Sequence, residues 1–203
     1  DAYWVSLCKK TWNTDDGLQK IHYSQQNESK RAGSHSETIN VNEFIAFYNS
    51  VQGEDIDIML EVKDKNLSAV KCINSLSPVK AINKLEKEWS KYKYSVLEKS
   101  KQGYDEIRQL LKNKNEYPAV EFYTVIEHAM LKEESPGNAL NAALHVWGYF
   151  KEAAQENEKT NFLALSSAYQ NGGATLARMK RLLFRLAEKY SQEYLLDSYY
   201  FDL

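Results

Sequence analysis

The stretch that decides the fold is IDIMLEV, residues 56–62 of a 203-residue chain. A short apolar run of this kind is typical of a β-strand buried in a parallel sheet. An earlier stretch, QKIHYS at residues 19–24, follows an Asp-Asp-Gly turn signal and alternates polar with apolar residues, as a second strand does. The two strands are separated by residues 25–38, which are almost wholly polar, a loop of a length that is usually functional or disordered.

Helical patterns alternate with these two strands. Residues 42–51 place their apolar side chains at helical spacing, and Asn66 is expected to cap a further helix that runs to about Leu76. Strands alternating with helices indicate parallel βαβ units, and in barrels of this kind the chemistry lies at the carboxyl ends of the strands. Two strands cannot close a sheet, and the chain opens on Asp1 rather than Met, so we expect a fragment of a longer protein.

Beyond the breaker at Pro78 the pattern is helical throughout. Clear helical spacing recurs at residues 89–97, 119–131, 139–150, 162–169 and 176–190, with breaks at Pro118, 135–137 and 171–173. This spacing predicts a bundle of about five or six helices and a domain boundary near residue 78.

The composition excludes several classes of protein. Lys and Arg number 26 against 28 for Asp and Glu, so no overall field attracts nucleic acid or a membrane, and any such contact must come from a local patch. Cys8 and Cys72 are too few for a disulfide framework, and no apolar run approaches the roughly 20 residues that span a bilayer. We expect a soluble protein of the reducing, intracellular compartment, cytoplasmic and without a membrane partner.

Four residues form the candidate site: Lys20, His22, His35 and Glu61. They come from one strand end, the polar loop after it, and the next strand end. Imidazole and carboxylate together suit Mn²⁺, Zn²⁺ or Fe²⁺. Other interpretations stay open: His22 as a hydrogen-bonded histidine at a strand end, His35 and Lys20 as solvated residues, and Glu61 as the partner of a lysine that follows it.

Three segments closely resemble, in order and spacing, the last two strands of the UV damage endonuclease family. They are KIHYS at residues 20–24, SHSETI at 34–39 and DIMLEVKDK at 57–65, and the resemblance covers residues 1–76. It implies a TIM-type barrel that uses a cluster of divalent metals, commonly Mn²⁺, to nick double-stranded DNA on the 5′ side of UV photoproducts. The implied fold is α/β plus all-α, with the C-terminal βα units of an incomplete barrel at 1–77 and a helical bundle domain at 78–203.

The resemblance also implies roles for the site residues. By position, His22, His35 and Glu61 match metal ligands, and Lys20 matches an active-site lysine that would stabilise the transition state or, if carbamylated, bridge two ions. The strands that supply the family's remaining ligands precede this segment. The chain alone is therefore expected to lack the complete metal cluster and to be inactive.

A second resemblance covers residues 84–203 and is to the YbgA-like helical family, whose activity is not established. The matching segments are KYKY at 91–94, NAL at 138–140, HVWGYF at 145–150, YQNG at 169–172 and YLLDSYYF at 194–201. The family occurs joined to nucleic-acid-related enzymes, which is only a hint of a partner.

Within the helical segment one positive stripe is a candidate nucleic-acid contact. Arg178, Arg181 and Arg185 share a helix face, with Lys180 alongside, as phosphate contacts would; the alternative is a solvated amphipathic helix. His128 is expected in the core, and His145 with Tyr149 at i, i+4 is expected to pack rather than to bind.

The sequence leaves three hypotheses for the function of the protein. The leading one is a metal-dependent DNA repair endonuclease of which the chain is the C-terminal part. Its rival is a non-catalytic helical nucleic-acid or protein interaction module, and the third is a helical domain that buttresses the barrel.

Overall fold

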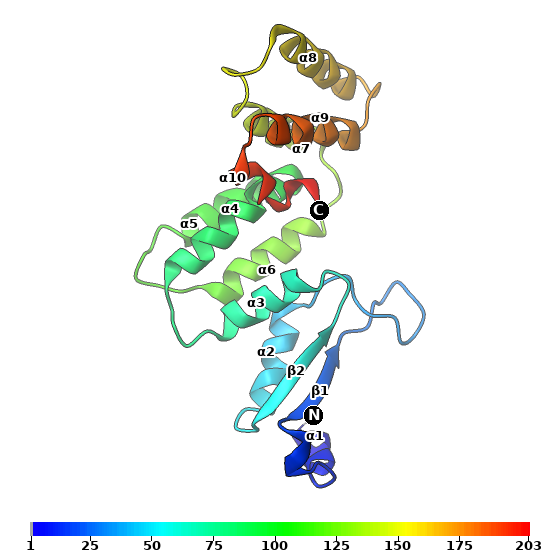
Figure 1. The fold of residues 1–203 in the computed structure, drawn as a ribbon, viewed down its shortest axis with the longest axis vertical. Coiled ribbons are helices and arrows are strands. Elements are labelled where there is room, and N and C mark those ends of the chain that lie inside the picture. The colour runs from blue at the N-terminus through cyan, green and yellow to red at the C-terminus, as the bar shows by residue number, and fades with distance from the viewer. Residues whose placement is uncertain (1) are drawn as a thin grey trace. The chain divides into compact units, whose positions relative to one another are not determined.

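The computed structural model describes residues 2–203. In this described part the chain is mixed α/β and mostly helical, with ten α-helices and one two-stranded parallel sheet (Figure 1). Two compact units are present. The first holds the residues up to Lys80 together with Ala119–Thr124, and the second holds Ala81–Pro118 and Val125–Leu203.

The first unit is built on the two predicted strands. Its elements are α1 (Ala2–Lys9), the 3-10 turn η1 (Thr14–Asp16), β1 (Gln19–Ser24), α2 (Val41–Ser50), β2 (Ile56–Glu61) and α3 (Asn66–Leu76). Strands β1 and β2 run parallel, in a register that pairs Gln19 with Ile56 and Ser24 with Glu61. Both strands and both following helices are thus confirmed, and both strands end at the same edge of the sheet.

The two faces of this sheet differ. One face packs against α2 and α3, where Tyr23 and Ile58 join a core that contains Phe44 and Cys72. The other face carries the residues that alternate with these, and its Met59 is 53% exposed. The period-two alternation of the strands therefore separates a core face from an accessible polar face.

One local prediction is wrong, because Asn66 is the first residue of α3 and not its cap. The N-cap is Lys65, which has a φ of 46° and gives no side-chain cap hydrogen bond. The chain leaves β2 through Asp64, whose N–H donates to the carbonyl of Glu37 at 3.0 Å. This tie turns the chain at Lys65, so the helix starts one residue earlier than its cap signal indicates.

The second unit is helical. Its elements are α4 (Ile82–Lys99), α5 (Lys101–Leu110), α6 (Ala119–Met130, whose first half belongs to the first unit), α7 (Pro136–Trp147), α8 (Glu156–Gln170), α9 (Leu176–Lys189), α10 (Glu193–Leu196) and the 3-10 turn η2 (Tyr199–Phe201). Every predicted helix is present. Helix α5 was not predicted; it begins directly after α4, where Ser100 caps it by accepting from the N–H of Gly103.

Close packing of α7 on α4 and α9 organises this unit. Ala139, Ala142 and Ala143 of α7 are fully buried, and these small side chains let the neighbouring helices approach closely. The C-terminal segment completes the core, because Tyr200 of η2 is fully buried and the Ser198 hydroxyl donates to the carbonyl of Lys91 on α4 at 3.0 Å.

The fold bears on two sequence-based expectations, the fold class and the place of His128. The α/β and helical parts are both present, whereas a two-stranded sheet does not define a barrel, so the barrel stays a prediction. His128 is exposed, and its expected place in the core is wrong, since it lies on the solvent side of α6. Among residues 2–203, no helix combines the length and the apolar character that crossing a bilayer requires.

Candidate functional site

The three predicted metal ligands converge at the carboxyl ends of the two strands. His22 Nδ1 lies 2.6 Å from Glu61 Oε1, and His35 Nε2 lies 3.6 Å from Glu61 Oε2. Register explains the first contact, because His22 is paired with Met59 and Glu61 lies two residues further along the same face. The partners of Glu61 are therefore the two histidines rather than Lys63 or Lys65, and His22 is hydrogen-bonded at the end of its strand.

The loop after β1 brings His35 to this point. Gln25 closes the base of the loop: its Oε1 accepts from Asn40 N at 2.7 Å, and its Nε2 donates to Asn40 O at 3.2 Å. Further along, Lys63 N donates to the carbonyl of Ser36 at 3.3 Å, which ties the loop to the segment after β2. Gln25 has no sequence signal beyond its polarity, yet it sets the path of the chain to His35.

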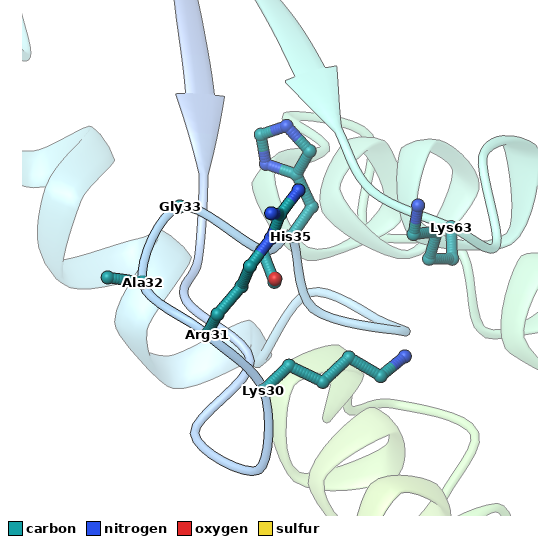
Figure 2. A pocket seen from close by; sticks show the side chains of 7 residues that line it. Lys30, Arg31, Ala32, Gly33, His35 and Lys63 are labelled. Atoms are coloured by element: carbon teal, nitrogen blue, oxygen red, sulfur yellow. The ribbon is translucent and has the colours of Figure 1, made fainter.

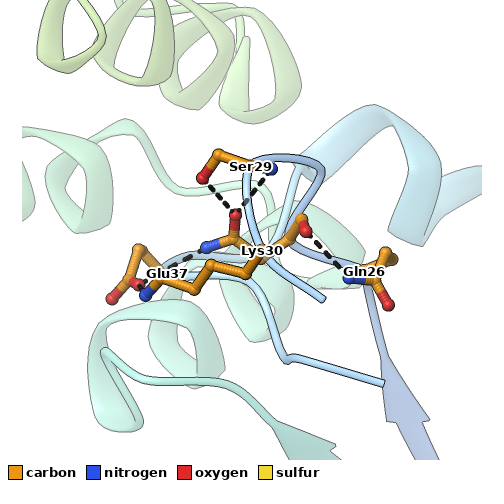
Figure 3. A network of polar contacts seen from close by, with 5 residues as sticks. Gln26, Ser29, Lys30 and Glu37 are labelled. Carbon is orange, nitrogen blue, oxygen red and sulfur yellow. Dashed lines mark hydrogen bonds and ion pairs between the residues drawn. The ribbon is translucent and has the colours of Figure 1, made fainter. Parts of the chain in front are cut away.

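A second glutamine orders the interior of the loop. The Gln26 amide nitrogen donates to the carbonyls of Asn27 and Arg31, and its Oε1 accepts from Gly33 N at 2.8 Å. The side chain of Asn27 accepts from the backbone N–H and the hydroxyl of Ser29 (Figure 3). The loop is thus held by its own side chains, as in compact functional loops.

An ion pair spans the same loop. Lys30 Nζ lies 2.6 Å from Glu37 Oε1 (Figure 3). The hydrogen bond and the charge of Lys30 lower the pKa of the Glu37 carboxyl below its ordinary value. Both side chains are more than half exposed, so the pair contributes little to stability but offsets the charge of Lys30.

Lys20 lies on the same sheet face as His22, two residues earlier on β1. It is exposed and is paired in register with Asp57, which is also exposed. The accessible face therefore presents an ammonium group on the strand that carries one of the imidazoles.

The donor types of this cluster suit a divalent transition metal, since it offers two imidazoles and a carboxylate. The number and arrangement of the donors fall short of a metal centre. Both Glu61 oxygens face the histidines, and no group of three or more His, Cys, Asp or Glu side chains is placed to hold an ion within the described residues. The two strands and the loop between β1 and α2 thus supply a converging partial set of ligands.

The predicted arginine stripe lines a groove between α8 and α9. The hollow measures about 540 Å³, and Arg178, Arg181 and Arg185 line it from α9, opposite Asn161 and Ala164 of α8. Across residues 2–203, none of the three arginines has an ion-pair partner. Uncompensated guanidinium groups along one groove are suited to binding phosphates.

Lys180 does not join this stripe. Its Nζ lies 2.9 Å from Oε2 of the buried Glu98. Burial raises the pKa of Glu98, while the adjacent ammonium opposes that shift. The sequence gives no hint of this pairing, because the two residues come from different helices and meet only through the packing of α9 near α4.

Glu158 holds α8 and α9 together at one end of the groove. It accepts from Lys189 Nζ at 2.7 Å and from the Tyr190 hydroxyl at 2.6 Å, and it also accepts from Gln155 N at 2.9 Å. These hydrogen bonds, that of Lys189 being the strongest influence, lower the pKa of Glu158 to about 2. An ionised Glu158 is therefore part of the frame that spaces the two helices.

The aromatic residues near the end of α7 pack against other aromatic rings, as expected. Trp147 stacks on Phe162 with ring centroids 4.3 Å apart, and Phe150 is fully buried. Tyr149 stacks on Tyr194, with ring centroids 5.7 Å apart. His145 is exposed, so the expectation that it packs with Tyr149 is wrong.

Comparison with known proteins assigns both parts of the chain. Residues 3–93 match the family described as UV-endonuclease UvdE, and residues 93–203 match the family described as Protein of unknown function (DUF1722). The chain belongs to the DUF1722 family, whose model covers more than half of it, and the segment in front of that match is similar to the UvdE family. Both resemblances drawn from the sequence motifs are thereby confirmed.

Two curated relatives are similar to the chain. One is a UV DNA damage endonuclease of Clostridium perfringens (strain 13 / Type A), 39% identical over 130 residues that make up 62% of this chain and 30% of the relative. The other is a Putative UV-damage endonuclease of Acanthamoeba polyphaga mimivirus, 39% identical over 62 residues, or 30% of this chain and 19% of the relative. The chain thus spans less than a third of the length of either. No solved structure gives a significant match.

The similarity to the clostridial relative extends beyond the segment that matches the UvdE family. An alignment over 62% of this chain is longer than the segment 3–93, so it continues into the helical segment. The similarity to the clostridial relative therefore includes residues on both sides of the junction between the two families.

Proposed function

We propose that residues 3–93 are the C-terminal part of a metal-dependent DNA repair endonuclease that nicks DNA on the 5′ side of UV photoproducts. The observation that carries this proposal is the convergence of His22, His35 and Glu61 at the carboxyl ends of two parallel strands. In a TIM-type barrel, which we propose as the complete fold, that edge is where active sites lie. The match to the UvdE family supports the same assignment.

His22, His35 and Glu61 would hold the divalent ion, which we propose to be Mn²⁺. When bound, such an ion supplies an acidified water and positive charge beside the phosphodiester. Two neutral imidazoles leave most of the ion's charge available to the phosphate, and the Glu61 carboxylate, whose oxygens lie beside both histidines, would be the third ligand. Further ligands would come from other strands of the complete barrel.

Lys20 has a separate role in this proposal. Its ammonium group lies on the accessible sheet face, on the same strand as His22 and two residues before it. It would stabilise the negative charge that develops on the phosphate oxygens as the bond is cleaved. Lys20→Met should lower the nicking rate while metal content stays at the parental level.

Because the chain holds a partial ligand set, residues 1–203 alone should bind Mn²⁺ weakly and should not nick irradiated DNA. Metal analysis of the purified chain and of the full-length protein that contains it tests this directly. A lesion-dependent nick made by the 203-residue chain would contradict the proposal.

For the helical unit we propose DNA binding through the groove between α8 and α9. The supporting observation is that three arginines share this groove and that none of them has an acidic partner in the described part of the chain. The described groove lining contains no acid, base and nucleophile together, which favours binding over chemistry. The alternative is a non-catalytic protein interaction module, and DNA affinity that is unaffected by replacing the arginines would favour it.

A further inference from the structure

A second basic site lies in the first unit, in the loop between β1 and α2. The loop and the segment after β2 enclose a hollow of about 410 Å³. Lys30 and Arg31 contribute to its wall from the loop, and Lys63 does so from beyond β2 (Figure 2). Three cationic side chains from two separate segments thus surround one depression.

The three cations of this hollow differ in whether they form an ion pair with an acidic residue. Lys30 is paired with Glu37, whereas Arg31 and Lys63 have no ion-pair partner among residues 2–203. The charge of Lys63 also acts on Glu37 at longer range, so this single carboxylate offsets only part of the charge of the three cations. An anion fits this balance better than a cation or an apolar group.

The shape of the hollow is set before any ligand arrives. The carbonyl of Arg31 and the N–H of Gly33 are both fixed by the side chain of Gln26, and Gly33 has a φ of 82°, which favours glycine. The backbone of Lys63 is tied to the loop, because its N–H donates to the carbonyl of Ser36. Pre-organisation of this kind lowers the entropic cost of binding.

The hollow is also continuous with the candidate metal ligands. His35 lines it and at the same time lies 3.6 Å from Glu61. A group bound between Arg31 and Lys63 would therefore lie beside the cluster at the strand ends, and not on a remote surface.

From these features we propose that this hollow is a subsite for a backbone phosphate of the DNA strand, with Arg31 and Lys63 as its ligands. The proposal rests on the proposed endonuclease function, which it deepens by naming residues that position the strand. Arg31 would bind two phosphate oxygens through its planar fork, and Lys63 would contribute a point charge. Neither residue needs to contact the scissile bond.

The test measures binding rather than cleavage. The 203-residue chain is titrated into a fluorescently labelled DNA duplex at several KCl concentrations, and the affinity is plotted against salt. Arg31→Ala and Lys63→Ala should each weaken binding on the order of five- to tenfold near 0.1 M salt and reduce the slope by about 0.9, the value for one lost phosphate contact. The double variant should show about twice the change in slope.

Two controls keep the result specific. Lys10→Ala removes the same charge from an exposed lysine that precedes β1 and should leave the slope unchanged. Arg31→Lys keeps the charge and should retain the slope, with an affinity between those of the parent and Arg31→Ala. Because Arg31 and Lys63 are exposed, circular dichroism should show each variant folded.

Failure of this subsite is distinguishable from failure of the endonuclease proposal. If Arg31→Ala and Lys63→Ala bind DNA as Lys10→Ala does, or if the parental chain does not bind DNA, the phosphate subsite is wrong. Lesion-dependent nicking by the full-length protein would still support the endonuclease. A full-length protein that binds DNA through Arg31 and Lys63 but never nicks it would instead contradict the endonuclease.

Discussion

The two basic hollows of this chain differ in what accompanies their cations. In the first unit, Arg31 and Lys63 lie next to His35, which faces Glu61. In the second unit, the three arginines of α9 lie among alanine, leucine and asparagine side chains. Imidazole and carboxylate can hold a metal or move protons, whereas guanidinium and aliphatic groups only bind. The difference places the proposed chemistry in the first unit and binding in both.

The two hollows also differ in how they are built. The first depends on a loop whose path is fixed by the side chains of Gln25 and Gln26. The second depends on helix periodicity, which places Arg178, Arg181 and Arg185 on one face of α9. The loop can bring residues of distant sequence beside a strand end, while the helix repeats one kind of contact along a line.

The largest expected effect is the loss of DNA cleavage when a proposed metal ligand of the first unit is replaced. In the full-length protein, His22→Ala and Glu61→Ala should each lower the rate of nicking irradiated plasmid by two or more orders of magnitude, on the order of the loss of a metal ligand. Metal content should fall in parallel. His128→Ala is the matched control, because this histidine is exposed on α6, and it should nick at the parental rate. Parental nicking by both site variants would mean that the cluster is structural.

The second effect is a loss of DNA affinity when the arginines of the second unit are replaced. Replacing Arg178, Arg181 and Arg185 together by Ala should weaken DNA affinity on the order of a hundredfold near 0.1 M salt and reduce the salt slope by about two to three. The turnover of bound DNA should change little. A charge-matched variant with Lys87, Lys112 and Lys151 replaced by Ala serves as the control, since these exposed lysines lie outside the groove. An unchanged slope would leave the stripe a solvated helix face.

A third effect concerns the thermal stability that Glu158 contributes by linking α8 and α9 beside the arginine groove. Because hydrogen bonds lower the pKa of Glu158 from 4.5 to about 2, its ionised form stabilises the folded state above pH 4.5, and this contribution is lost as the pH falls towards 2. Glu158→Gln should therefore lower the melting temperature by a few degrees at pH 7, and the difference should shrink steadily below pH 4.5. Glu156→Gln, on the same helical turn but highly exposed, should change it less. An equal loss at every pH would show that the charge of Glu158 is not involved.

The smallest expected effect is a gain of DNA affinity when the acidic partner of Lys30 in the first hollow is replaced. Glu37→Gln should free Lys30 from its ion pair and strengthen DNA binding a few-fold, with a salt slope steeper by at most about 0.9. Anisotropy titrations of the 203-residue chain measure this. Glu28→Gln is the control, because Glu28 is an exposed residue of the same loop. If both variants gain equally, general charge rather than Lys30 explains the effect.

Periodicity explains why much of the fold could be predicted. The alternation in residues 19–24 and the apolar run at 56–62 locate β1 and β2, and the 3.6-residue spacing locates most helices. Helix α5 escaped prediction because it follows α4 with only Ser100 between them, so that the two patterns merge. His128 was misplaced because the apolar content around it does not reveal which side of α6 it occupies.

The candidate site was predictable only in part. His22, His35 and Glu61 could be named from their motifs, and the register of the two strands accounts for the contact between His22 and Glu61. The approach of His35 depends on a loop closed by the Gln25 hydrogen bonds to Asn40, which no periodic pattern encodes. Likewise, Lys180 could not be separated from its arginine neighbours by spacing alone, because its partner Glu98 lies on another helix. Long-range side-chain contacts of this kind appear only in the folded chain.

The most direct test of the central claim is the cleavage of an end-labelled duplex that carries one UV photoproduct. The full-length protein is incubated with this duplex and with its undamaged counterpart, with Mn²⁺ present or removed by chelation. We expect a single nick on the 5′ side of the lesion, only in the damaged duplex and only with metal. Folded, metal-supplied protein that leaves the damaged duplex intact, or that cuts both duplexes alike, would contradict it.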